Sequence, residues 1–115
     1  MSFTNLDYLQ NITGGDTATI RELILLFIDQ IPEFTGNMKK YLEEQKYLEL
    51  GKVAHKAKSS VMIMGMDDLG HDLKLLQLGT INGTGVETYA QHVSRFENEC
   101  SIAVEELQQE LLKMG

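Results

Sequence analysis

Lys52-Val53-Ala54-His55-Lys56-Ala57-Lys58-Ser59-Ser60 is the stretch that decides the fold of this chain, within a segment at residues 47–64 whose pattern predicts an amphipathic helix. With about 100° of rotation per residue, one side of this helix is the expected core face. It comprises Leu50, Val53, Ala57, Ser60, Val61 and Met64. His55 points the opposite way, into solvent. The residues expected around His55 are Gly51, Lys52, Lys58, Ser59 and Met62.

This arrangement would suit a histidine that carries an anion. Lys52 and Lys58 each lie one turn from His55, where their charges can reach a group attached to the ring. Gly51 and Ser59 are small, so the ring should stay approachable. Most surface histidines and lysines have no such role, and the spacing alone does not decide the question.

Length and composition limit the possible functions. The 115 residues predict one domain spanning residues 1–115, and 43% hydrophobic residues can supply its core. The net charge of −7 argues against a nucleic-acid partner. Cys100 is the single cysteine, which predicts a reducing, cytoplasmic location without an internal disulfide. No apolar run is long enough to span a membrane, no signal peptide is expected in residues 1–8, and we expect a monomer.

Two helices are predicted before residue 45. A short one at residues 5–12 would begin at a Thr4 cap, turn Leu6, Leu9 and Ile12 inward, and end at Gly14-Gly15. A long one at residues 17–44 would begin at an Asp16 cap. Its apolar stripe continues in phase across Pro32, which predicts a kinked helix rather than a break. The stripe comprises Ile20, Ile24, Phe27, Ile31, Phe34, Met38 and Tyr41.

The helix of His55 is followed by two more. Gly65 is its expected C-cap, and Asp67 and Asp68 mark the first turn of the next helix. The inward residues of that helix would be Leu69, Leu73, Leu76 and Ile81. The last helix, at residues 86–114, carries a stripe of Val86, Tyr89, Val93, Phe96, Cys100, Ala103, Leu107, Leu111 and Met114. The prediction is an all-α fold, an antiparallel four-helix bundle with a short additional N-terminal helix.

The placement of the histidines in the sequence does not favour metal binding or hydrolysis. His55, His71 and His92 fall on three different predicted helices, with no metal-ligand spacing among them. We expect His71 and His92 to be structural or exposed, and Cys100 to be a buried small hydrophobe. A convex helix face is a poor site for chemistry on a small molecule. It suits a group that must enter the active site of another protein.

The run Ala54-His55-Lys56-Ala57-Lys58-Ser59-Ser60, followed by Gly65 and a leucine-rich helix, resembles the histidine-containing phosphotransfer (HPt) domain of two-component phosphorelays. The motif of that family is a histidine, a lysine three residues later, and then glycine or another small residue. Here these are His55, Lys58 and Ser59, with serine in place of the commoner glycine. The resemblance extends from about residue 13 to the C-terminus and includes the spacing of Phe27 and Pro32.

The resemblance implies that His55 accepts a phosphoryl group from the aspartate of a receiver domain and passes it to another receiver. Lys58 would steady the phosphoryl group, and Gln77 matches a glutamine that some family members use. The partners would be receiver domains of response regulators or hybrid kinases, with Mg²⁺ bound by the receiver and no cofactor on this chain. No nucleotide-binding loop is present, so no autonomous kinase activity is expected.

Docking is expected through the surface around His55. The residues expected in this contact are Gly51, Lys52, Lys56 and Met62. An apolar contact from Met62 would exclude water beside the ring, and the lysines would offset the acidity of the chain. The alternative function is a non-catalytic helical adaptor that docks a signalling partner through the same face.

Overall fold

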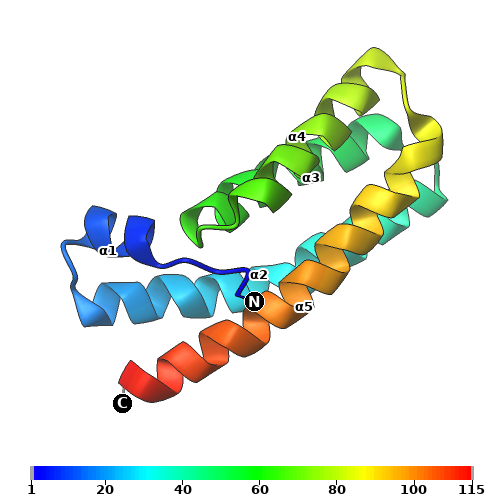
Figure 1. Cartoon of the computed structure of the whole chain (residues 1–115). Coiled ribbons are helices and arrows are strands. Elements are labelled where there is room, and N and C mark those ends of the chain that lie inside the picture. The colour runs from blue at the N-terminus through cyan, green and yellow to red at the C-terminus, as the bar shows by residue number, and fades with distance from the viewer. Residues whose placement is uncertain (1, 115) are drawn as a thin grey trace.

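The computed structural model describes residues 2–114, and within them the chain is all-helical. The elements are α1 (Asp7–Thr13), α2 (Thr17–Glu43), α3 (Tyr47–Ile63), α4 (Asp67–Asn82), the 3₁₀ turn η1 (Val86–Thr88) and α5 (Tyr89–Met114). The two long helices α2 and α5 lie side by side (Figure 1). The α3–α4 hairpin packs on them toward the α2–α3 turn, and α1 lies over the first half of α2.

The predicted starts and stops of the helices are largely confirmed. Asp16 caps α2, with its carboxylate accepting the Thr19 amide at 3.0 Å. Gly14 ends α1 in the left-handed conformation, at φ +64°. Helix α2 continues unbroken through Pro32, which is exposed. The last helix begins later than predicted, because residues 86–88 form a 3₁₀ turn.

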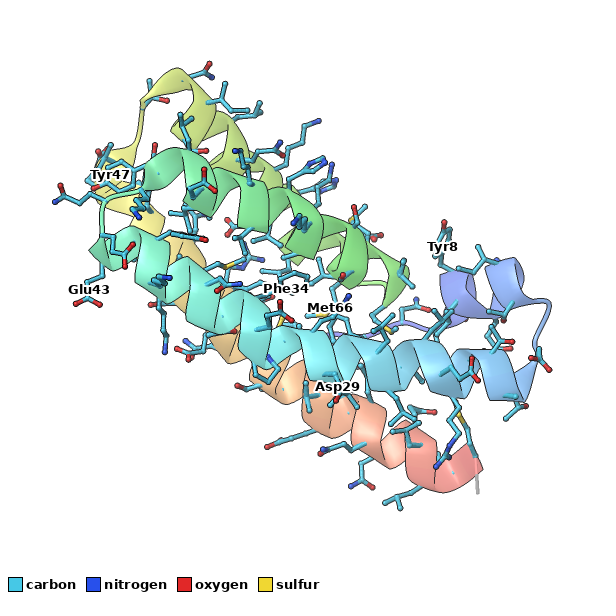
Figure 2. All side chains as sticks on the ribbon, turned by 180° about the vertical axis from the view of Figure 1, so that it is seen from behind. Tyr8, Asp29, Phe34, Glu43, Tyr47 and Met66 are labelled. Carbon is cyan, nitrogen blue, oxygen red and sulfur yellow. The ribbon has the colours of Figure 1, made fainter. Side chains whose placement is uncertain are left out.

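The core follows most of the predicted stripes. The buried apolar side chains form one cluster from all five α-helices, and α2 and α5 supply most of their predicted stripes to it. Phe34 and Met66 lie among the inner side chains in Figure 2, whereas Tyr8 projects from α1 into solvent. Three residues predicted to point inward are exposed: Ile12 by 52%, Ile81 by 59% and Val86 by 43%. Each lies near the end of its element, where no neighbouring helix covers it.

Thr4 does not cap α1, contrary to the prediction. Helix α1 begins at Asp7 without a side-chain cap at Leu6. Thr4 instead donates its amide (2.9 Å) and its hydroxyl (2.7 Å) to the carboxylate of Glu106 on α5. A tertiary partner has therefore replaced the local capping partner that the sequence pattern predicted.

Glu106 anchors the whole N-terminal segment. Besides Thr4, its carboxylate accepts the Ser2 hydroxyl at 2.7 Å and the Phe3 amide at 2.9 Å. Burial raises the pKa of Glu106, but the hydrogen bonds from Phe3, Thr4 and Ser2 outweigh that effect and lower the pKa to about 2. The segment continues to Asn5, whose amide donates to the Met64 carbonyl at 2.9 Å and so joins the segment to the end of α3.

Replacing Glu106 with alanine should therefore lower stability in a pH-dependent way. Because the folded-state pKa lies below the ordinary glutamate value, the contribution is present above about pH 4.5 and is lost as the pH falls toward 2. After allowance for solvent screening we expect Glu106→Ala to cost about 1–2 kcal/mol at pH 7. The difference in free energy of unfolding between the variant and the wild type should narrow steadily below pH 4.5.

Urea unfolding followed by circular dichroism at several pH values measures this difference. Glu105→Ala is the matched control, because Glu105 is the exposed neighbour of Glu106 on the same helix. A gap that stays constant between pH 7 and pH 3 would contradict the anchoring role of the Glu106 carboxylate.

Candidate functional site

His55 lies on the exposed side of α3, as predicted, but the core face of this helix is rotated from the predicted one. Its buried residues are Leu50, Gly51, Ala54, Ala57 and Val61. Val53 and Ser60 are only partly buried and border α2, where the Ser60 hydroxyl donates to Gln30 Oε1 at 3.1 Å. The core face is rotated because α4 packs closely along one side of α3. It covers residues that the helical periodicity of the sequence had predicted to be exposed to solvent.

Gly51 is the clearest case, because it is buried where an exposed position was predicted. It was expected to contact a partner, but it is buried against Thr80 of α4. A Cβ at position 51 would collide with Thr80 Oγ1 and lie 3.1 Å from Thr80 Cβ. Glycine at this position therefore permits the close approach of the two helices, and its small remaining surface lies in the wall of a groove beside His55.

Met62 also differs from its prediction. It is half-buried rather than exposed, because its thioether lies against Gly70 of α4. A Cβ at Gly70 would collide with the sulfur and lie 2.9 Å from Met62 Cγ. One edge of Met62 still lines a groove with Ser59 and Tyr8, so it keeps an accessible surface next to the face of His55.

The close approach of α3 and α4 brings Gln77 to His55. Gln77 Oε1 lies 3.3 Å from His55 Nδ1, across 22 positions of sequence. An amide oxygen can only accept, so in this arrangement Nδ1 carries the proton and donates it. In the neutral ring the lone pair is then on Nε2. Gln77 was the weakest of the predicted site residues, and the structure brings it into contact with His55.

The lysines around the ring differ in their surroundings. Lys52 is 71% exposed and lies 3.3 Å from Glu49 on its own helix, a pair of little energetic weight. Lys56 is exposed, Lys58 is half-buried, and Ser59 is exposed. Within residues 2–114 neither Lys56 nor Lys58 forms an ion pair. Their charges are therefore available to an incoming anion.

A groove of about 570 Å³ borders His55 on the side toward the start of α3. His55, Lys52 and Gln77 line it together with two exposed apolar side chains, Leu48 (62%) and Ile81 (59%). Sequence reasoning missed both of these as surface residues. The signal was present for Leu48, which lies seven residues before His55 and so on the same face of α3.

The remaining histidines and the cysteine have structural surroundings. His71 is exposed, and His92 Nδ1 lies 2.8 Å from Asp72 Oδ2 between α5 and α4. Cys100 is buried, and burial, with a contribution from the Glu99 charge, raises its thiol pKa to about 12. The prediction that it is a buried hydrophobe is confirmed.

Two general properties of the described chain complete this description. In residues 2–114 no three His, Cys, Asp or Glu side chains converge to hold a metal ion. No helix in that range combines the length and apolar character needed to cross a bilayer.

Comparisons with protein-family models, curated proteins and solved structures find no match for this chain.

The contact between Gly51 and Thr80 yields a test of this geometry. Gly51→Ala should lower the free energy of unfolding by about 1–3 kcal/mol, since the added methyl group overpacks the α3–α4 interface. Adding Thr80→Ala removes the colliding hydroxyl and should recover part of the loss.

Gly36→Ala in α2 is the matched control, because no atom lies within 4 Å of its Cβ position. It should stabilise the protein by about 0.5–1 kcal/mol, through helix propensity alone. Chemical unfolding of the four proteins measures these differences. A Gly51→Ala variant as stable as the wild type would show that the helices are not in close contact at this point.

Proposed function

We propose that this chain is a phosphocarrier of a two-component phosphorelay, in which His55 accepts a phosphoryl group from the aspartyl phosphate of one receiver domain and passes it to the aspartate of another. The proposal also takes the four long helices as the antiparallel bundle of an HPt domain. The observation that carries it is the contact between His55 Nδ1 and Gln77 Oε1, on an exposed ring near Lys56 and Lys58, which form no ion pair within residues 2–114.

The contact with Gln77 suits the chemistry of a histidine nucleophile. The neutral ring attacks phosphorus through the lone pair of Nε2, and the bond between phosphorus and the aspartyl oxygen breaks. The aspartate leaves as a carboxylate, while Nδ1 keeps its proton and the ring gains positive charge. Gln77 Oε1 faces that developing charge and so favours the phosphorylated state.

Lys58 and Ser59 would act on the phosphoryl group itself. During transfer the negative charge is spread over the three outer phosphoryl oxygens. Lys58 lies one turn from His55, so its ammonium can donate a charge-assisted hydrogen bond to one of them. Ser59 is small and exposed, which leaves room for the receiver to approach the ring.

The surface around the ring supplies a docking face for a receiver. Leu48 and Ile81 are exposed on one side of His55, and the accessible edge of Met62 lies on the other. Apolar contact on both sides would exclude water from the transferring phosphoryl group. Lys52 and Lys56 would meet the acidic surface at a receiver's active site. The receiver supplies the acceptor aspartate and the Mg²⁺ that neutralises charge in transfer.

Transfer from a phosphorylated receiver separates this proposal from a non-catalytic adaptor. The chain is incubated with a response-regulator receiver domain charged by acetyl phosphate. The proposal predicts phosphate on this chain that is labile in acid and stable in base, as expected for phosphohistidine. Phosphate that stays on the receiver in the presence of a stable complex would favour the adaptor.

The variant His55→Gln completes this test. His55 is exposed and adds little to the core, so the variant should unfold at nearly the wild-type temperature. It should take up no phosphate. His71→Gln is the control, since it removes another exposed histidine, and it should be phosphorylated as the wild type is. Undiminished phosphorylation of His55→Gln would place the site on another residue.

A further inference from the structure

The α3–α4 hairpin pairs residues across its interface in a regular order. His55 contacts Gln77, and seven residues further along α3 Met62 contacts Gly70, seven residues before Gln77. The two helices therefore run antiparallel with one register over this whole stretch. On the other side of His55, Gly51 lies four residues before it and contacts Thr80, three residues after Gln77, so the pairing there is offset by one residue.

This register places Lys58 opposite Lys74. Lys58 is three residues after His55, and Lys74 is three residues before Gln77, so both lie one turn along the hairpin in the same direction. Lys74 is exposed, and Lys58 is half-buried at the border of the two helices. The register thus places one lysine from each helix at the same level of the hairpin, one turn from the ring.

Neither lysine has a carboxylate partner within residues 2–114. The two helices carry four lysines against four carboxylates, so the net charge of −7 resides on the rest of the chain. Of those carboxylates, Glu49 pairs with Lys52, and Asp72 turns toward α5 to meet His92 and Arg95. Like charges that face each other repel, and an anion between them removes the repulsion.

We infer that Lys74 is a second lysine of the phosphoryl site, so that Lys58 from α3 and Lys74 from α4 hold the outer oxygens of a phosphoryl group on His55 from two sides. This inference rests on the proposed function of His55. The transferring group carries its charge on three outer oxygens, so two ammonium groups can each bind a different oxygen. Lys74 comes from a helix other than that of the motif, so the motif alone does not indicate it.

Phosphoramidate, a small donor of phosphoryl groups, tests the inference without any receiver. Its P–N bond breaks, ammonia leaves, and a bond forms between phosphorus and His55 Nε2. The rate at which the phosphohistidine resonance appears in ³¹P NMR is compared among variants. Lys74→Ala and Lys58→Ala should each slow phosphorylation by about threefold to tenfold, the range for partly exposed charge-assisted contacts.

A graded series at position 74 separates a charge effect from a structural one. Lys74→Arg should keep nearly the wild-type rate, and Lys74→Glu should be slower than Lys74→Ala. Raising the ionic strength should shrink these differences by screening. Lys113→Ala is the control, an exposed lysine near the end of α5 and outside the α3–α4 hairpin, and it should stay within about twofold of the wild type.

The outcomes distinguish this inference from the proposed function. If Lys74→Ala matches Lys113→Ala while the wild type is phosphorylated on His55, Lys74 has no part in the site, and the proposed function stands. Graded rates with phosphoramidate support the role of Lys74 even if no receiver transfers phosphate to the chain. A wild-type chain that takes up no phosphate at His55 from phosphoramidate would overturn both.

Discussion

The close approach of α3 and α4 is the constraint on which the site depends. Gly51 lies against Thr80 and Gly70 against Met62, so a larger residue at either glycine would force its neighbour to shift. Between these two contacts lie His55 and Gln77, which can meet at 3.3 Å only because the helix backbones are this close. The contact favours the tautomer that carries its proton on Nδ1 and has its lone pair on Nε2. A packing contact therefore sets the chemistry of an exposed side chain.

The rest of the molecule holds this hairpin in place. Its buried side chains join those of α2 and α5 in one core, so the exposed side of α3 is presented on a supported surface. The N-terminal segment ties the end of α3 to α5, through the Asn5–Met64 backbone hydrogen bond at one point and the Glu106 carboxylate at the other. A histidine held on a rigid element keeps its orientation while a partner docks.

Sequence patterns predicted the helices well because each signal is local. The apolar stripes, the Asp16 cap and the Gly14 stop act within one helix, and α2 continues through Pro32 as its unbroken stripe indicated. The errors in predicted exposure arose at residues that a neighbouring helix covers. Gly51 and Met62 were assigned to the surface because a helical wheel does not indicate which neighbour lies on which side or how close it comes.

The same limit applied at the site. His55 and Lys58 could be predicted from their spacing on one helix, whereas the contact with Gln77 depends on the register between two helices. Thr4 shows the opposite error. Its sequence pattern predicted a helix cap, but its amide and hydroxyl donate to the carboxylate of Glu106 on another helix instead. Ile81 shows that a residue in phase with a core stripe stays exposed where the covering helix ends.

The tautomer of His55 tests the central claim most directly. Long-range ¹H–¹⁵N correlation spectra of the ¹⁵N-labelled protein report which ring nitrogen carries the proton, at about pH 8, where an imidazole is ordinarily neutral. The account predicts that His55 carries its proton on Nδ1, and that Gln77→Ala returns the ring to the tautomer mixture of a free histidine. A His55 ring protonated mainly on Nε2, with the same spectrum in the wild type and in Gln77→Ala, would contradict it.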